Sequence, residues 1–278
     1  MVSGVTDLYR YWEDEFKKQD LSAPFEVDNN DFRGISKKVR NYFRLNYYPQ
    51  PFYGYLNEDM SKDILMPLIN PGPISNINVA EHFPAETLEE SIALHNYQIY
   101  ERHTGKWSKE IFHQKEREYD VQYGGRNKHW RGKKLNQVRR LLGEDIEFLH
   151  TIEFFPFHSD KFGGFSKEDQ NKLYNLPSTI RSINALEDIA SKKLVKHILG
   201  IGMPWAAILD HYPSLFTKVG YQELTGPKGG VSQRFYKYKP VKNPDGLPIL
   251  IYSTTSMNIP NPITNSQGAN IFHEFLEI

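Results

Sequence analysis

The chain contains no cysteine. This absence excludes disulfide bonds, thiol nucleophiles, cysteine-based zinc sites and iron–sulfur clusters held by thiolates. Histidine occurs ten times, but the sequence has no His-Glu-x-x-His motif and no tight group of histidine and aspartate. We therefore expect neither a metal site nor a cofactor.

Long apolar runs are also missing. No stretch of 18 consecutive apolar residues occurs, and the first residues, Met-Val-Ser-Gly-Val, lack a basic region followed by an apolar one. A helix that spans a bilayer needs about 20 apolar residues, and a secretory signal needs both of those regions. The sequence therefore predicts a cytoplasmic protein that has no membrane partner.

Neither sign of charge is in excess, because Lys and Arg number 34 and Asp and Glu also number 34. A protein that coats duplex DNA is usually more basic, so nucleic-acid contacts would require positive charge gathered in one place. Such a place exists between residues 115 and 140, where nine basic residues accompany only three acidic ones. Tyr, His and Trp rings are interleaved with these basic side chains.

Phosphate contacts combined with stacking rings suit an unpaired strand or a flipped-out nucleotide. We therefore predict that single-stranded DNA, or DNA with a flipped-out base, contacts Arg126, Lys128, Arg131, Lys133 and Lys134. The alternative is a solvated helix face followed by an exposed loop, because most runs of charge only meet water.

Apolar periodicity and capping residues divide the chain into alternating helices and strands. We predict helices at residues 6–18 (capped by Thr6), 36–43, 87–103, 133–142, 167–174, 178–193, 205–210 and 269–276. We predict strands at residues 64–69, 146–155, 194–201, 218–223, 234–238 and 248–252, and a loop at 46–57. This alternation is typical of an α/β fold, a three-layer sandwich in which helices cover both faces of a central, mainly parallel sheet.

We expect one domain, residues 1–278, because no repeat or low-complexity linker divides the chain. Residues 1–45 would form an N-terminal helical extension and residues 115–142 a basic insertion. Ligands of such sheets bind beyond the carboxyl ends of the strands. Residues 70–73, 153–159 and 253–258 each end or interrupt a predicted strand, so we expect all three segments on one rim.

The sequence Leu68-Ile69-Asn70-Pro71-Gly72-Pro73 resembles the first motif of the uracil-DNA glycosylase superfamily, and is most similar to its single-strand-selective monofunctional branch. The segment Thr151-Ile152-Glu153-Phe154-Phe155-Pro156 occupies the place of the superfamily's base-reading strand. The segment Ile251-Tyr252-Ser253-Thr254-Thr255-Ser256-Met257-Asn258 falls where its last motif is found. The order and rough spacing agree over residues 48–278, so the resemblance implies a uracil-DNA-glycosylase-like fold.

The resemblance also implies roles for individual residues. Asn70 would hold the attacking water, and Ser253 stands where the superfamily has a histidine that donates to the departing base. Glu153 stands where it has the base-reading asparagine. Five further residues are candidates. His158 would be an alternative acid or base, and the Tyr53 ring would stack on the base. Pro71, Gly72 and Asn258 would line the base-binding pocket.

An ionised Glu153 can only accept hydrogen bonds, whereas uracil offers a donor beside an acceptor. The resemblance therefore implies a divergent DNA glycosylase, an enzyme type of DNA repair, that acts on a base other than plain uracil. Two alternatives stay open. In the first, the chain is a non-catalytic nucleic-acid or nucleotide-binding module of the same fold. In the second, it hydrolyses the N-glycosidic bond of free nucleosides or nucleotides.

Overall fold

The computed structural model describes residues 3–19, 34–45, 47–159, 163–202, 204–226, 229–254 and 258–277. The chain forms two compact units that are interleaved in sequence. Unit 1 comprises Met1–Tyr53, Leu68–Ser108 and Ile152–Ala185, and unit 2 comprises Gly54–Pro67, Lys109–Thr151 and Leu186–Ile278. The backbone passes between the units after Tyr53, after Ser108, and within strands β2 (Met60–Leu68) and β3 (Leu149–Glu153) and helix α8 (Pro177–Lys192).

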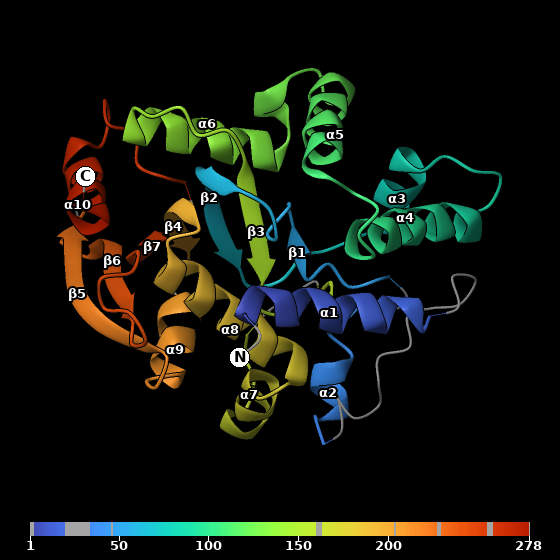
Figure 1. The fold of residues 1–278 in the computed structure, drawn as a ribbon, viewed down its shortest axis with the longest axis horizontal. Coiled ribbons are helices and arrows are strands. Elements are labelled where there is room, and N and C mark those ends of the chain that lie inside the picture. Colours follow the sequence, from blue (N-terminus) through green and yellow to red (C-terminus); the bar gives the residue numbers. More distant parts are fainter. Residues whose placement is uncertain are drawn as a thin grey trace. The chain divides into compact units, whose positions relative to one another are not determined.

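In the described part of the chain the strands form a seven-stranded sheet in the order β1-β3-β2-β4-β7-β6-β5. Its other members are β1 (Phe52–Tyr53), β4 (Val195–Ile201), β5 (Phe216–Thr225), β6 (Val231–Pro240) and β7 (Ile249–Thr254). Strands β3, β2, β4 and β7 run parallel, whereas β6 is antiparallel to both β7 and β5 (Figure 1). The predicted α/β class with a mostly parallel sheet is therefore confirmed. The three-layer, glycosylase-like arrangement stays a prediction.

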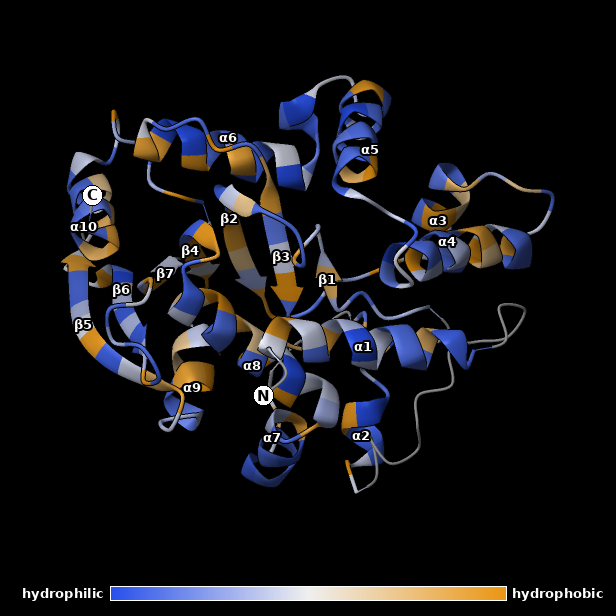
Figure 2. Ribbon diagram, in the orientation of Figure 1, coloured by the Kyte–Doolittle hydropathy of each residue, from blue (hydrophilic) through white to orange (hydrophobic). Residues whose placement is uncertain are grey.

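Strand β2 is a buried, central strand of the sheet. Ile64, Leu65 and Met66 are fully buried, as expected for a central strand that is covered on both faces. Figure 2 shows β2 in largely hydrophobic colours. The strand begins at Met60, four residues before the predicted start, because Met60 pairs with Val195 of β4. The polar residues between Met60 and Ile64, where the register with β4 shifts, have no apolar periodicity.

Unit 1 begins with helix α1 (Gly4–Lys17), whose buried residues Val5, Leu8, Trp12 and Phe16 form one face. The prediction that Thr6 caps this helix was wrong. Ser3 is the cap, and its Oγ accepts a hydrogen bond from the Thr6 backbone N–H at 3.4 Å. The Phe16 ring stacks on His103 with 5.0 Å between ring centres.

Two other helices of unit 1 differ from expectation. Helix α2 (Lys37–Arg40) is shorter than the predicted 36–43, because Phe43 instead forms a β-bridge with Ser159. Helix α3 (Asn76–His82) was not predicted, since Val79 is its only buried residue and leaves no apolar period to detect. Helices α4 (Leu88–His103), capped by Thr87, and α7 (Lys167–Tyr174) lie where they were expected.

Unit 2 contains the basic segment. Helix α5 (Lys109–Gln122) was not predicted and is mostly hydrophilic (Figure 2), with Phe112 as its one buried residue. A short 3-10 turn, η1 (Arg126–Lys128), leads to helix α6 (Trp130–Leu142), which buries Leu135, Val138 and Leu141 and ends at Gly143. The predicted helix over residues 133–142 is therefore confirmed but begins three residues earlier.

The rest of unit 2 follows the predicted order. Helix α9 (Pro204–His211) precedes the antiparallel pair β5 and β6, which a hairpin at residues 226–230 joins. Residues 227–228 of that hairpin lie outside the described residues. The last helix, α10 (Ser266–Leu276), begins three residues before the predicted Ala269, because the side chain of Asn265 caps it. Among the described helices, none has the length and apolar character needed to cross a bilayer.

Candidate functional site

Two of the three predicted rim segments lie side by side in unit 1. The backbone N–H of Phe154 donates to Leu68 O and that of Phe155 donates to Ile69 O, both at 2.8 Å. These bonds align the carboxyl ends of β2 and β3. The turn at residues 70–73 therefore leaves the sheet beside the chain that follows β3, as the sequence predicts for neighbouring parallel strands.

Asn70 is fixed to that neighbouring segment by its side chain. Its Nδ2 atom donates to Ser159 Oγ at 2.8 Å, and Ser159 itself is buried. The Asn70 side chain is half-buried, as are Pro71 and Gly72. Because Nδ2 is engaged, Oδ1 is the atom of Asn70 left to accept a hydrogen bond from a water or ligand.

The turn itself requires glycine for its backbone rather than for space. Gly72 has a φ of +83°, in the left-handed region that residues with a Cβ rarely adopt, and a Cβ added there would meet no atom within 4 Å. The Gly72 carbonyl accepts a hydrogen bond from His158 Nδ1 at 3.1 Å. The backbone conformation and the buried ring together define the shape of the turn.

His158 uses both ring nitrogens inside the protein. A carbonyl can only accept, so Nδ1 carries the hydrogen, and Nε2 accepts from the Gln50 side-chain amide at 3.0 Å. Burial lowers the pKa of His158 to about 4, so the ring is neutral near pH 7. As placed, His158 supports the turn, and its predicted catalytic role stays a prediction.

A buried arginine that the sequence analysis did not single out stands behind His158. Arg102, on α4, donates to Gln50 Oε1 at 3.3 Å, so hydrogen bonds run from Arg102 through Gln50 and His158 to the turn. Its guanidinium also lies 4.7 Å from the centre of the Tyr53 ring. Tyr53 is buried against this cation, an arrangement that does not favour its predicted role as a ring stacking on a base.

Glu153 is the last residue of β3 and only 5% exposed. Its backbone N–H donates to Pro51 O at 2.8 Å, which ties the end of β3 to the residue before β1. The carboxyl group therefore belongs to the interior of unit 1, on the strand that ends beside Asn70. Its predicted contact with a base stays a prediction.

The remaining predicted pocket residues belong to unit 2. Ser253 lies in β7, where it is buried and pairs with Arg234 of β6. Asn258 is exposed, and its Oδ1 accepts from Gln137 Nε2 at 3.4 Å. Residues 255–257 of the predicted third segment lie outside the described residues. The convergence of Ser253 and Asn258 with the residues of unit 1 on one pocket stays a prediction.

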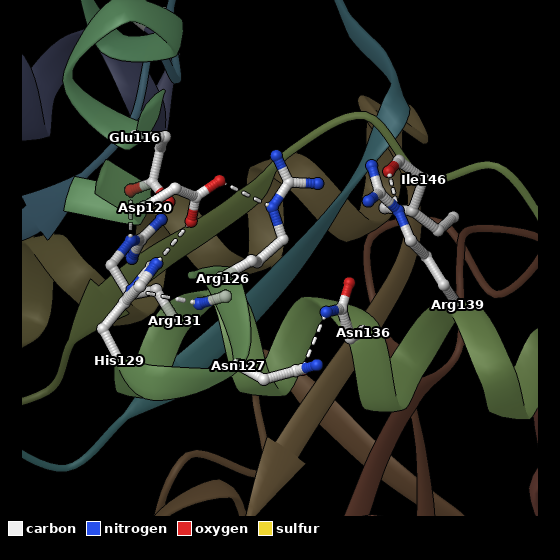
Figure 3. A network of polar contacts seen from close by, with 10 residues as sticks. Glu116, Asp120, Arg126, Asn127, His129, Arg131, Asn136, Arg139 and Ile146 are labelled. Carbon is white, nitrogen blue, oxygen red and sulfur yellow. Dashed lines mark hydrogen bonds and ion pairs between the residues drawn. The ribbon is translucent and has the colours of Figure 1, made fainter. Parts of the chain in front are cut away.

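Two acidic residues of the basic segment, Glu116 and Asp120, hold two of its arginines, Arg131 and Arg126 (Figure 3). Asp120 accepts hydrogen bonds from Arg126 Nε at 3.0 Å and from His129 Nε2 at 2.7 Å. Burial opposes ionisation of Asp120, but these two hydrogen bonds outweigh it and lower its pKa. Arg131 pairs with Glu116 at 2.9 Å and donates to the Leu149 carbonyl. These contacts join α5, η1, α6 and β3.

The five residues that were predicted to contact DNA therefore differ in whether their charged groups are already paired or buried. Arg126 and Arg131 have carboxylate partners, and Lys134 is buried, with its pKa lowered by burial and its Nζ donating to Gln137 Oε1. Lys128 and Lys133 are exposed, and neither forms an ion pair with any described residue. Of the basic residues predicted to meet phosphate, these two are both exposed and without a carboxylate partner among the described residues.

Lys133 and Asn258 also meet at a cavity of unit 2, beyond the carboxyl end of β7. The cavity has a volume of about 350 Å³. It is lined by Lys133, Gln137, Arg140, Gln233, Tyr252, Thr254, Asn258, Ile259, Pro260, Asn261, Thr264 and Asn265. No carboxylate occurs among these residues. Two of these residues, Lys133 and Asn258, were predicted from the sequence as site residues. Arg140 could have been found as well, because it lies seven residues after Lys133 and therefore on the same face of α6.

Among the described residues, no group of three or more His, Asp or Glu side chains could hold a metal ion. Comparison of the chain with protein-family models, curated proteins and solved structures gave no match. The functional assignment therefore depends on the chemistry of the residues described above.

Proposed function

We propose that the protein is a DNA glycosylase-like enzyme that acts on a base other than plain uracil. The observation that carries this proposal is the placement of Asn70. Its turn lies beside the end of β3, its Nδ2 is engaged by Ser159, and its Oδ1 is left as an acceptor. A group that positions an attacking water must accept a hydrogen bond from that water, and Asn70 Oδ1 meets this requirement.

In the proposed reaction, the water held by Asn70 adds to the sugar carbon while the bond from that carbon to the base nitrogen breaks. The departing base carries negative charge and takes up a proton, and the water loses one. Ser253, on β7, would donate a hydrogen bond to the developing charge. An ionised Glu153 would accept from amino or N–H groups of the base, which disfavours the carbonyl of uracil.

A second candidate function, a non-catalytic nucleic-acid-binding module, is favoured by the state of His158. Its ring is neutral, its one N–H donates to the Gly72 carbonyl and its other nitrogen accepts from Gln50, so it is not placed to give a proton to a departing base. A turn without an available acid can still bind a nucleotide. The two functions differ in whether a base is released.

The test uses single-stranded oligonucleotides that each contain one uracil, one modified cytosine or one deaminated purine. After incubation with the protein, alkali cleaves any abasic site. We expect cleavage at a modified cytosine or deaminated purine and negligible cleavage at uracil, because the base mismatch disfavours uracil by roughly 1–3 kcal/mol. Having serine in place of a stronger donor removes about another 3–4 kcal/mol of transition-state stabilisation.

Asn70→Ala should abolish that cleavage, whereas Asn171→Ala, at an exposed position of α7 in the same unit, should leave it unchanged. Robust uracil excision that disappears in Asn70→Ala would contradict the altered target but keep the enzyme. If the protein binds the oligonucleotides and releases none of the bases, the binding module is the correct function.

A further inference from the structure

The cavity of unit 2 has a positively charged wall. Lys133, Gln137 and Arg140 are spaced i, i+4 and i+7 on α6, so their side chains share one face of the helix. The opposite face of α6 is packed into the protein by its buried apolar residues. Lys133 and Arg140 are exposed, and neither forms an ion pair with any residue that the structure describes.

The side-chain amide of Gln137 has a defined orientation. Lys134 Nζ can only donate, so the Gln137 atom that it contacts at 3.3 Å is the oxygen Oε1. The Nε2 atom of Gln137 then donates to Asn258 Oδ1 at 3.4 Å. Both ends of Gln137 are thus used to join α6 to the segment that follows β7, and the oxygen of Asn258 is used as well.

The facing wall presents donors by the same reasoning. The backbone N–H of Gly268 donates to Asn265 Oδ1 at 3.1 Å, which fixes Asn265 Nδ2 as the donor to Gln233 Oε1, also at 3.1 Å. Tyr252 donates to that same Gln233 oxygen. The amide oxygen of Gln233 is therefore occupied, and its Nε2 donates to no atom of the described residues.

Asn261 repeats this pattern. Its Oδ1 accepts from the Ile263 backbone N–H at 3.0 Å, and its Nδ2 has no acceptor in the described part of the chain. The amides around the cavity therefore use their oxygens within the protein, and two of them have nitrogens left for a ligand. Two cations, amide N–H groups and hydroxyl groups, without any carboxylate, match the oxygens of an oxyanion.

From this arrangement we propose that the cavity binds the phosphate group of a nucleotide-sized ligand, with Lys133 and Arg140 on one side and Gln233 and Asn261 on the other. At about 350 Å³ the cavity lies within the range of small-molecule sites, which begins at roughly 300 Å³. The phosphate belongs either to a free mononucleotide or to the 5′ end of a strand. This site does not depend on the glycosylase-like proposal, because its residues take no part in base release.

Isothermal titration calorimetry with the full-length protein tests the proposal. The probes are inorganic phosphate, a deoxynucleoside 5′-monophosphate, the same deoxynucleoside without phosphate, and a short single strand with and without a 5′-phosphate. We expect phosphate-bearing probes to bind at least about tenfold more tightly than their matched unphosphorylated forms. Binding of the mononucleotide, or of the phosphorylated strand alone, identifies the source of the phosphate, and either supports the proposal.

Two variants and two matched controls locate the binding. Lys133→Gln combined with Arg140→Gln should weaken phosphate binding at least about tenfold, whereas Arg117→Gln with Lys167→Gln, at exposed positions outside the cavity, should not. Gln233→Glu keeps the oxygen that accepts from Tyr252 and Asn265 but replaces the donor by a negative oxygen, so it should also weaken binding. Gln122→Glu, on exposed α5, adds the same charge as its control.

If the two double variants weaken phosphate binding equally, the ligand is attracted by the net charge of the protein and the proposal is overturned. So would unchanged binding in Gln233→Glu, or the absence of a phosphate preference in the unaltered protein. Circular dichroism of each variant establishes that it is folded. If the Lys133/Arg140 variant does not fold, Gln233→Glu decides the question alone.

Discussion

The buried state of His158 predicts how the stability of the protein changes with pH. The unfolded chain binds a proton at this ring with an ordinary pKa of about 6.5, whereas burial, with Arg102 nearby, lowers the pKa in the folded protein to about 4. Above pH 6.5 both states are neutral, so the ring adds no pH dependence. Below pH 6.5 the unfolded chain gains the proton first, so the free energy of unfolding falls as the pH falls toward 4.

At pH 5 the solution lies about 1.5 units below the ordinary pKa of histidine, and each unit corresponds to about 1.4 kcal/mol. His158 should therefore remove about 2 kcal/mol of stability between pH 7 and pH 5. His95, whose pKa burial and the neighbouring His158 lower to about 3, should act in the same direction. Its contribution is largely retained when His158 alone is replaced.

The assay is urea unfolding, followed by circular dichroism at pH 7 and pH 5, for the unaltered protein and His158→Gln. Glutamine lacks the titration, so the variant should lose about 2 kcal/mol less than the unaltered protein over this interval. His211→Gln, at an exposed position of α9, is the matched control and should keep the original pH dependence. Parallel losses in the unaltered protein and His158→Gln would refute the assignment of a buried, neutral ring.

Two further substitutions test contacts within unit 2 by the same unfolding measurement. Gly54→Ala should lower the free energy of unfolding by about 2–6 kcal/mol, because φ at Gly54 is +123° and a Cβ would overlap the buried Nδ1 of His150; a loss below about 1 kcal/mol would contradict this. Arg131→Ala should lower it by about 2–3 kcal/mol, since it leaves Glu116 and the Leu149 carbonyl without their donor. A stable Arg131→Ala protein that only loses DNA binding would instead support the original interpretation of the basic segment.

Helices with a clear cap and a periodic apolar face could be predicted closely. Thr87 marks the start of α4, and the bounds of α7 agree with expectation. Helices α3 and α5 could not be predicted, because each buries a single residue and is otherwise polar. Tertiary contacts such as the Arg131–Glu116 pair stabilise α5, and no local pattern reveals them.

The site could be predicted only in part, for a related reason. A mainly parallel sheet implied that residues 70–73 and 153–159 share one rim, and the bonds beside Asn70 agree with that. A count of charges between residues 115 and 140 could not show that Asp120 and Glu116 engage Arg126 and Arg131. Ion pairs between residues of different helices depend on the tertiary fold. The spacing of Lys133 and Arg140 within α6, by contrast, can be predicted from the sequence.

Because the segments of the two units alternate along the chain, residues that pack together within unit 1 are synthesised far apart in time. Helix α1 is completed at Lys17, but the buried Trp12 ring packs against Phe157, which lies 140 residues beyond the end of the helix (157 − 17). At a synthesis rate of about 5–20 residues per second, about 7–28 s pass between the completion of α1 and the synthesis of Phe157. During that time Trp12 lacks this partner on the nascent chain. We therefore expect chaperones that act on nascent chains to bind α1 before its partners are made.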